Sequence, residues 1–463
     1  MQRWPLFRSS NLTNQKRQNL PNWPEIIWIS SNKKDYPRVL GINPWIYDFA
    51  AYNFWARPVG LISCLTMLKL VGCEVALLDC LYPMWKDIKW PKPAKYGTGP
   101  YPRVELPKPC GLENVPRKFA RYGLDFNAVK GALKNMSPPD FVLVSTIMTY
   151  WYPGLIAVIS LIRKIFKKTK IIVGGIYSTL CMEHAQKNLD VDLIIKGPVE
   201  KEENWNLLMK FMGLPLCKAN FRISSEFYPE PYFSIILGSR GCPFSCDYCA
   251  SKILYTNFIQ RPFEDIFEEF LFDYKRGVRD FVFYDDALLY QPENWFIPFL
   301  EKIIKNGYKV RFHTPNGLHI RYLTKDICIL MKRAGFKTIR LGLETRNFLS
   351  RLDKKLTKDQ WDRGVKNLLQ AGFNREDIGV YILFALPGQR DEEVISTIEF
   401  AKSFGFRPHL AYFTPIPGSK LFQKAKSHSF YPIEEDPIYQ NNAIWPCYPG
   451  GFSWEKRSFF RKL

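Results

Sequence analysis

The amino-acid sequence predicts an α/β protein in which a doubly wound (Rossmann-like) parallel sheet precedes a partial (β/α)6 TIM-type barrel. Two observations lead to this prediction. Short apolar runs alternate with amphipathic stretches of helical length along most of the chain, which is typical of parallel strands joined by helices. In the second half the alternation becomes regular, and glycine follows several predicted helices at the position that commonly ends a helix: Gly277, Gly307, Gly335, Gly372 and Gly405.

The length of 463 residues is sufficient for two or three domains. Changes in composition and pattern divide the chain into five segments. We expect a polar N-terminal arm over residues 1–24, a doubly wound domain over 25–200, a linker with one helix over 201–232, the barrel over 233–425 and a C-terminal tail over 426–463.

In the doubly wound domain, the strands and helices are predicted from apolar runs and helical periodicity. The predicted strands are residues 39–42, 74–79, 141–145, 170–173 and 192–195, and the predicted helices are 58–71 and 154–166. A loop rich in Pro, Gly and Lys is expected from about residue 83 to residue 116. Ligands of such sheets bind at the carboxyl ends of the strands, so functional residues are expected directly after these runs.

The barrel is predicted from six successive strand–helix units. Its strands are residues 234–237, 280–284, 309–312, 338–343, 379–384 and 409–413, and its helices are 264–275, 293–305, 325–334, 358–371 and 392–404. In barrels of this kind the chemistry is carried by the loops that follow the strands.

The bulk properties limit the partners and the compartment. The formal charge of +21 is compatible with nucleic acid, an anionic surface or a phosphorylated substrate, but Lys and Arg are scattered rather than blocked, so nucleic acid is a possible but not a favoured partner. Residues 1–17 lack the apolar core of a signal peptide. Residues 141–162 carry no charge, but Pro153 and Gly154 divide them into a strand and a helix, so we expect no membrane span. We expect a cytoplasmic protein, because the eleven cysteines show no disulfide framework.

The strongest functional signal is the loop that follows the first barrel strand. It holds Cys242, Cys246 and Cys249 in the order C-x3-C-x2-C. Three thiolates on one short loop can ligate three irons of a [4Fe–4S] cluster and leave the fourth iron open. A structural zinc site is disfavoured because it needs a fourth ligand, and no second C-x2-C pair or nearby histidine is present. A disulfide is disfavoured by the odd cysteine count.

This loop, with aromatic Tyr248 before its third cysteine, resembles the signature loop of the radical S-adenosylmethionine (SAM) superfamily. The resemblance implies that SAM binds the open iron. It also implies that an electron, supplied by a donor such as ferredoxin or flavodoxin, cleaves SAM to a 5′-deoxyadenosyl radical.

Residues 35–200 resemble the cobalamin-binding domain that often precedes a radical SAM barrel, whose pattern is D-x-H-x-x-G, later S-x-L, later G-G. Ser145 begins the second element, and Gly174 and Gly175 form the third after a spacer of 26 residues from Ile147. The first element is absent, and His184 is the single histidine of this half. Either cobalamin is bound without a histidine ligand or the domain keeps the fold without the cofactor.

Polar or glycine-rich residues also follow the later barrel strands. From the resemblance we expect SAM contacts at Tyr248, Asp285, Asp286, Asn316, Glu344 and Gly388. A carboxylate at these places can accept hydrogen bonds from the SAM ammonium. The alternatives are ordinary: Asp286 or Glu344 as a helix cap or solvated residue, His319 as a structural histidine, and Gly388 as part of a turn.

The sequence therefore predicts a radical SAM enzyme, with cobalamin-dependent methyl transfer to an unactivated carbon of a small-molecule substrate as the leading reaction. The first alternative is a radical SAM cyclase or oxidoreductase that does not use cobalamin. The second is a basic, non-catalytic iron–sulfur protein that binds RNA.

Overall fold

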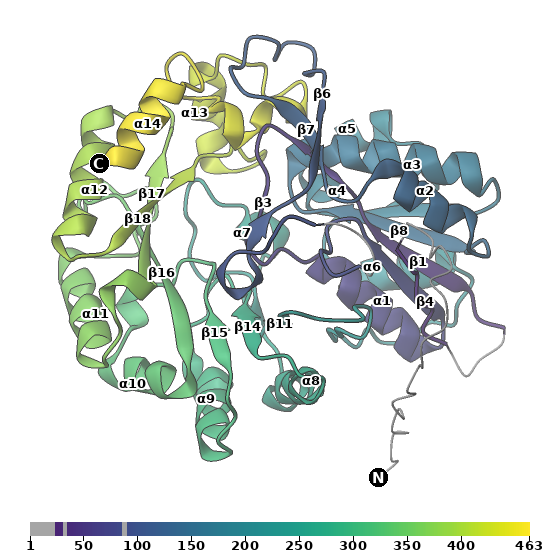
Figure 1. Cartoon of the computed structure of the whole chain (residues 1–463), viewed down its shortest axis with the longest axis horizontal. Coiled ribbons are helices and arrows are strands. Elements are labelled where there is room, and N and C mark those ends of the chain that lie inside the picture. The colour runs from purple at the N-terminus through teal and green to yellow at the C-terminus, as the bar shows by residue number, and fades with distance from the viewer. Residues whose placement is uncertain (1–23, 31–34, 86–89) are drawn as a thin grey trace.

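The computed structural model describes residues 24–30, 35–85 and 90–463, so the predicted arm over residues 1–24 lies outside the described residues except for its last position. The chain forms two lobes that lie side by side (Figure 1). The purple and blue N-terminal lobe contains a five-stranded sheet, and the green lobe contains a six-stranded sheet.

The N-terminal sheet is fully parallel, with the strand order β10-β9-β8-β1-β4. Its strands are β1 (Arg38–Asn43), β4 (Glu74–Asp79), β8 (Phe141–Thr146), β9 (Lys170–Gly175) and β10 (Leu193–Ile194). Numbered along the chain, this is the order 2-1-3-4-5 of flavodoxin-like sheets, which bind ligands where the order reverses. The predicted doubly wound sheet is therefore confirmed.

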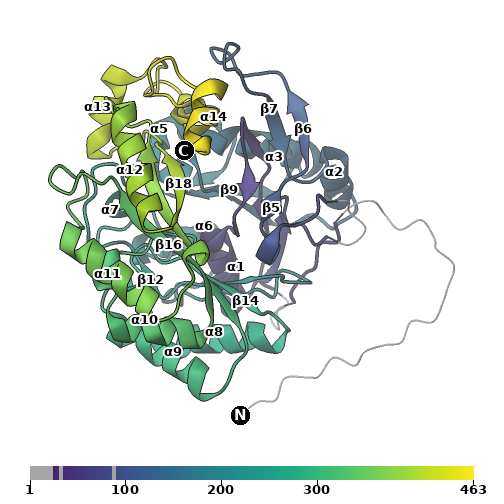
Figure 2. The same ribbon diagram turned by 60° about the vertical axis from the view of Figure 1, so that its left-hand side comes forward.

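Helices cover both faces of this sheet, as the turned views show (Figure 2). They are α1 (Val59–Val71), α2 (Phe126–Lys134), α3 (Tyr152–Ile165), α4 (Ile176–Leu180), α5 (Met182–Asn188) and α6 (Glu202–Phe211). The uncharged stretch at residues 141–162 forms β8 and α3, as expected. No helix among the described residues is long and apolar enough to cross a membrane.

The segment predicted as a long loop carries additional strands. β6 (Arg103–Leu106) pairs with β7 (Phe119–Tyr122), which also pairs with β2 (Ile46–Asp48), and β3 (Tyr52–Asn53) pairs with β5 (Gly99–Pro100). These strands are two to four residues long, too short to show a two-residue alternation. The prediction of an irregular loop at 83–116 was wrong for this reason.

The barrel sheet is also fully parallel, with the order β11-β14-β15-β16-β17-β18. Its strands are β11 (Ser234–Ile236), β14 (Asp280–Phe283), β15 (Arg311–His313), β16 (Phe336–Glu344), β17 (Ile378–Phe384) and β18 (Arg407–Tyr412). The helices outside it are α8 (Phe263–Lys275), α9 (Phe296–Lys305), α10 (Lys325–Ala334), α11 (Lys358–Gln370) and α12 (Asp391–Ser403). The partial barrel matches the prediction strand for strand.

The two faces of the barrel strands pack against different partners. Phe281 and Phe283 of β14 lie in the core beneath the outer helices, whereas Val282 of the same strand lies in the core of the N-terminal lobe. The alternation of side chains along a strand produces this division. The open side of the barrel is thus covered by the N-terminal lobe.

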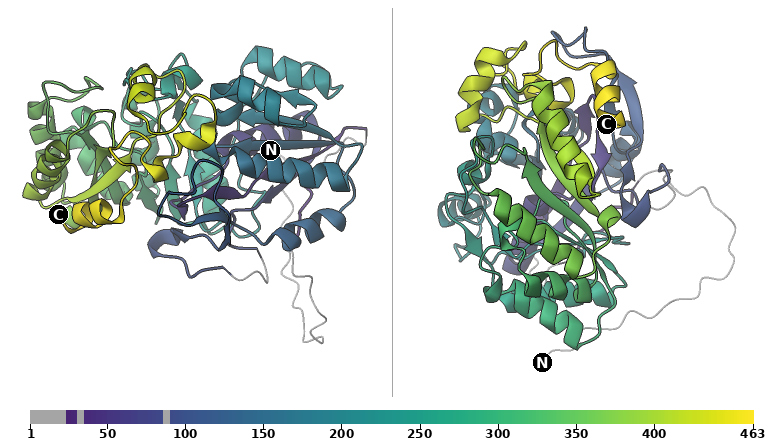
Figure 3. Two further views of the ribbon diagram at one scale, coloured as in Figure 1. Left: turned by 90° about the horizontal axis from the view of Figure 1, so that it is seen from above. Right: turned by 90° about the vertical axis from the view of Figure 1, so that its left-hand side faces the viewer.

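The C-terminal segment joins the two lobes (Figure 3). After α13 (Lys420–His428), Trp445 packs in the barrel core, while Ile438 packs with Phe119 in a smaller cluster of the N-terminal lobe. Asn441 donates a hydrogen bond to buried Asp48 (2.8 Å), and α14 (Trp454–Lys462) returns to the barrel through the Lys456–Asp391 ion pair (2.7 Å). The segment therefore helps to hold the lobes together.

Candidate active site

The cysteine loop leaves β11 at the edge of the barrel sheet. Its first residues form β12 (Ser239–Arg240), which pairs antiparallel with β13 (Ile259–Gln260) and returns the loop to the barrel. Gly241 has φ of +76°, and a Cβ there would lie 2.6 Å from the carbonyl oxygen of Asn257, so this turn requires glycine.

The three predicted cluster ligands are free thiols held near one another. The Cys249 N–H donates to the Cys246 carbonyl (3.1 Å), which makes a tight turn between these two ligands. Burial raises the pKa of Cys246 to about 12, with the charges of Cys249 and Cys242 adding to the rise and Lys355 opposing it. No group of His, Cys, Asp or Glu in the described ranges is arranged to hold a single metal ion. In a cubane cluster, however, each thiolate binds a different iron.

The two carboxylates after β14 have different surroundings. Asp285 is fully buried, and its oxygens accept hydrogen bonds from the Gly238 N–H (3.1 Å) and the Ser239 hydroxyl (2.6 Å). Asp286 accepts a hydrogen bond from the Ser251 hydroxyl (3.1 Å) and lines the main cavity. Asp285 thus anchors the start of the cysteine loop, and Asp286 is the carboxylate that faces the cavity.

Burial raises the pKa of Asp285 to about 7, although its hydrogen bonds oppose the rise. Between pH 4 and 7 Asp285 is therefore protonated in the folded state and ionised in the unfolded chain. Its contribution to the free energy of unfolding falls as the pH rises through this range. The difference between 7 and the ordinary 3.8 corresponds to about 4 kcal/mol.

We expect Asp285→Asn to gain stability relative to the native chain as the pH rises from 4 to 7, measured by urea unfolding at each pH. The exposed control Asp359→Asn should follow the native curve, and a constant offset for Asp285→Asn would contradict this assignment.

Tyr248 and Glu344 meet around a buried cation that the sequence did not reveal. The Lys355 ammonium lies 3.5 Å from Glu344, 3.6 Å from Asp353 and 3.5 Å from the Tyr248 hydroxyl. Burial favours the neutral amine, but the carboxylates outweigh it and raise the pKa of Lys355, so the ammonium stays charged. Asp353 is itself held by two hydrogen bonds from Arg351, both 2.8 Å. This charged cluster contacts Tyr248, which lies in the turn between Cys246 and Cys249.

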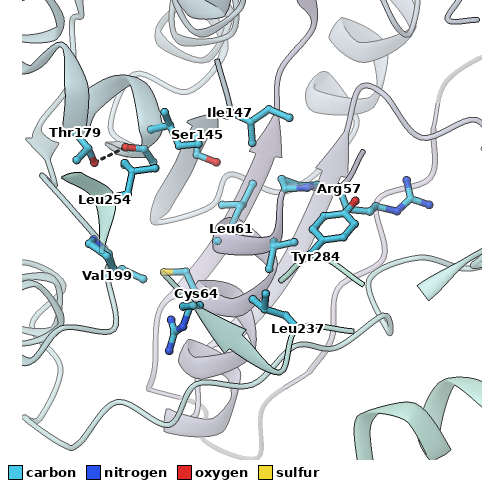
Figure 4. Close-up of a pocket in the computed structure, with 18 of the residues that line it drawn as sticks. Arg57, Leu61, Cys64, Ser145, Ile147, Thr179, Val199, Leu237, Leu254 and Tyr284 are labelled. Carbon is cyan, nitrogen blue, oxygen red and sulfur yellow. Dashed lines mark hydrogen bonds between the residues drawn. The ribbon is translucent and has the colours of Figure 1, made fainter. Parts of the chain in front are cut away.

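A cavity of about 560 Å³ lies between the lobes, within the usual range for ligand sites. Its walls come from the ends of β8 and β9, from α1, and from the cysteine loop and the strand ends of the barrel. It is surrounded by Leu61 and Cys64 of α1, by Ser145 at the end of β8 and Ile147 just after it, and by Leu237 of the barrel (Figure 4).

The cavity brings together predicted residues from both lobes. Ser145, Gly174 and Gly175 line it from the N-terminal side, and Asp286 and Asn316 line it from the barrel side. Asn316 is held by hydrogen bonds to the carbonyls of Tyr284 (3.0 Å) and Asp285 (3.3 Å).

The two glycines that end β9 serve different purposes. Gly175 has φ of +98°, and a Cβ there would lie 3.2 Å from the Cβ of Ser145, so it is required by the turn. At Gly174 a Cβ would meet nothing within 4 Å, so this glycine leaves space in the cavity. The Thr179 hydroxyl donates to the Gly175 carbonyl (2.6 Å) and fixes the turn (Figure 4).

No histidine is among the residues that line this cavity. His184 lies on α5, where its Nδ1 is hydrogen-bonded to the Tyr177 hydroxyl (2.6 Å). Arg57 lines the cavity, but its guanidinium extends toward Asp79 (3.8 Å) and stacks on Tyr228 (4.1 Å). The described part of the site thus offers no imidazole to a ligand in the cavity.

Four predicted SAM contacts, Tyr248, Asp285, Glu344 and Gly388, are not among the residues that line this cavity. Gly388 also lies apart from the charged cluster around Lys355. It has φ of +74° in the turn after β17, and a Cβ there would lie 3.4 Å from His428 of α13. Lys355 and Arg351 are the site residues that sequence reasoning missed. The one sequence signal that could have identified them is their position in the loop after β16, where functional residues of such barrels are found.

Comparison with known proteins agrees with this geometry. A family model described as the radical SAM superfamily matches residues 236–401. An uncharacterized methyltransferase of Pyrococcus horikoshii is 26% identical over 198 residues, which is 42% of this chain and 42% of that protein. A bacteriochlorophyllide d C-12(1)-methyltransferase of Chlorobaculum tepidum is 24% identical over 284 residues, 55% of this chain and 60% of that protein. The chain spans about half the length of the curated relatives it matches.

Two solved structures have a similar fold over most of the chain. The radical S-adenosylmethionine methyltransferase TsrM of Kitasatospora setae has a TM-score of 0.62 at 15% identity, covering 85% of this chain and 77% of its own. The cobalamin-dependent S-adenosylmethionine radical enzyme OxsB has a TM-score of 0.53 at 13% identity, covering 88% and 58%. Residues 236–401 therefore carry the radical SAM domain, and both lobes together have a fold similar to that of TsrM and OxsB.

Proposed function

We propose that this enzyme is a cobalamin-dependent radical SAM methyltransferase that acts on an unactivated carbon of a small-molecule substrate. The observation that carries the proposal is the single cavity shared by Ser145, Gly174 and Gly175 of one lobe and Asp286 and Asn316 of the other. When bound, the cluster and SAM supply the 5′-deoxyadenosyl radical, and cobalamin supplies the methyl group. The chain's own residues position these groups and keep water away.

The barrel residues fit a SAM molecule bound beside the cluster. Asp286 presents a carboxylate oxygen to the cavity, which suits the SAM ammonium. The Ser251 hydroxyl donates a hydrogen bond to Asp286 and lies 3.3 Å from the Cys249 sulfur. One short chain of contacts therefore links this carboxylate to a predicted cluster ligand. Cys242, Cys246 and Cys249 would hold the three irons.

The N-terminal residues fit a corrin that has no imidazole ligand from the protein. Leu61, Leu143 and Ile147 give the cavity an apolar wall, and Gly174 leaves open space beside it. Ser145 supplies a hydroxyl at the end of β8. These residues would hold cobalamin through apolar contacts and one hydroxyl, which supports the cofactor without the missing D-x-H element.

The same chemistry implies the remaining parts of the proposal. A cluster with an open iron needs a reducing compartment, which for this protein we take to be the cytoplasm. It also needs a one-electron donor, for which a ferredoxin or a flavodoxin is suited.

The proposal is tested on anaerobically purified and reconstituted full-length protein. Iron, sulfide and cobalt are quantified, SAM and dithionite are added, and 5′-deoxyadenosine is measured. We expect about four irons per chain, as three ligands and one open iron require, together with bound cobalamin and SAM-dependent 5′-deoxyadenosine. Cys246→Ala should lose the cluster and the product.

The other outcomes separate the alternatives. A cluster that yields 5′-deoxyadenosine without any affinity for cobalamin would replace the methyltransferase with a cobalamin-independent radical SAM enzyme. A protein whose SAM cleavage is absent in both the native chain and the Cys246→Ala variant, and whose RNA affinity falls steeply with salt, would indicate the RNA-binding alternative.

A further inference from the structure

The inner face of the barrel sheet carries two groups of basic residues, and only one of them is neutralised. On the β14 and β15 side, Arg311 donates to Asp280 (2.5 and 2.6 Å), and His313 is hydrogen-bonded to the same carboxylate (2.9 Å). On the β16 to β18 side, the inner face presents Arg340 and Arg407, and neither forms an ion pair among the described residues.

The strand register brings the second group together. Arg340 of β16, Gly379 of β17 and Arg407 of β18 lie in one row across the sheet, and His409 lies one row further along. Gly379 provides the space: a Cβ there would lie 2.9 Å from Arg340 Nη1 and 2.7 Å from His409 Nε2. Both side chains therefore lie over the same glycine.

Arg340 and His409 are half-buried and incompletely hydrogen-bonded, and Arg407 is exposed. The Nε of Arg340 and the Nε2 of His409 are buried without a hydrogen-bond partner in the described part of the chain. Burial, with help from Arg340 and Arg407, lowers the pKa of His409 to about 4, so this histidine is neutral at pH 7. Arg340 and Arg407 then share one row of the sheet, and no ion pair among the described residues neutralises either of them, so their like charges repel.

The group lies beside the reaction cavity. The Arg340 guanidinium is 5.8 Å from the ring of Phe54, which lines that cavity and is 36% exposed. Tyr381, which neighbours His409 across the sheet, donates its hydroxyl to the carbonyl of Pro315 (2.7 Å), another residue of the cavity wall.

We propose that Arg340 and Arg407, beside His409, form an anion subsite that binds a carboxylate or phosphate group of the substrate. An anion held between the guanidinium groups of Arg340 and Arg407 would remove the repulsion between them. Guanidinium groups recognise both anions with paired hydrogen bonds. The role in substrate binding rests on the proposed function, but the affinity for an anion does not.

The test measures thermal unfolding of the reconstituted full-length protein in sodium phosphate, sodium acetate and sodium chloride at equal ionic strength. We expect phosphate or acetate, but not chloride, to raise the midpoint in a saturable way, and the more effective of the two identifies the source of the anion. Arg340→Met should weaken the apparent affinity about 10- to 100-fold, the usual effect of losing a charge-assisted hydrogen bond. In chloride alone its midpoint should stay or rise, because the repulsion is gone.

The control is Arg346→Met, which removes one exposed arginine from the loop after the same strand and should leave the anion response unchanged. The inference is overturned if neither anion exceeds chloride. It is also overturned if Arg340→Met lowers the midpoint in chloride and keeps the native anion response, since Arg340 would then be structural. Formation of 5′-deoxyadenosine is followed in the same samples, so a failed anion response with intact SAM cleavage removes this inference and not the proposed function.

Discussion

Lys355→Met is expected to destabilise the protein by about 3–5 kcal/mol, the usual cost of leaving a buried charge without its partner. The ammonium lies 3.5 Å from Glu344, whose side chain is only 13% exposed, and 3.6 Å from Asp353, which is 1% exposed. In the variant, Asp353 remains paired with Arg351. Glu344 loses its ion pair, because Lys355 is its one ion-pair partner within the described residues. Methionine fills a similar volume, so the lost charge dominates the effect. Urea unfolding followed by tryptophan fluorescence measures it.

Two further variants show whether charge is the cause. Lys355→Met combined with Glu344→Gln removes both members of the pair and should recover more than half of the lost stability. Lys358→Met, three residues away, breaks an exposed pair with Asp362 and should cost less than about 0.5 kcal/mol. If the double variant is no more stable than Lys355→Met, the packing of the side chain rather than its charge is what matters.

The same variant is informative about the cluster. Lys355 is a positive charge close enough to Cys246 to affect its pKa, so its removal should make the cluster harder to reduce. A midpoint potential measured by electron paramagnetic resonance during a redox titration is expected to shift to more negative values in Lys355→Met.

Lys355 also shows where sequence reasoning stops. The cysteine loop was predictable because its three ligands are local and their spacing alone specifies the chemistry. Lys355 follows Lys354 directly, and nothing in the sequence distinguishes the exposed lysine from the buried one. Its role depends on Tyr248, which is 107 residues earlier in the chain, and such a contact is fixed by the fold.

Asp285 and Asp286, which follow β14, are a second case in which the sequence does not show which of two neighbouring residues faces the cavity. Both were predicted as SAM contacts because both follow a strand of the barrel. Neighbouring side chains at a strand end point in different directions, so Asp285 is hydrogen-bonded within the cysteine loop and Asp286 faces the cavity.

The strands and helices of both sheets were predictable, because runs of buried residues in a parallel sheet are long and clear. The short strands between residues 99 and 122 were not, because runs of two to four residues are too short to show an alternation.

Gly174→Leu is expected to abolish cobalamin retention while leaving the fold and SAM cleavage intact. A Cβ at this position meets no atom within 4 Å, so a larger side chain is accepted by the protein and occupies the cavity instead. It lies on the wall contributed by the N-terminal lobe, whereas Asp286 lies on the wall contributed by the barrel. Cobalamin affinity, measured by absorbance titration, should fall at least about 100-fold in the leucine variant, a loss of about 3 kcal/mol, and by less in Gly174→Ala.

The neighbouring glycine provides the contrast that makes this result interpretable. Gly175→Ala forces an alanine into φ of +98° against Ser145, so we expect a loss of about 1–2 kcal/mol in stability whether or not a cofactor is present. If cobalamin occupies this cavity, Gly174→Leu loses the cofactor at native stability and still produces 5′-deoxyadenosine. If Gly174→Leu binds cobalamin as the native chain does, the cofactor lies elsewhere, and the cavity belongs to the substrate alone.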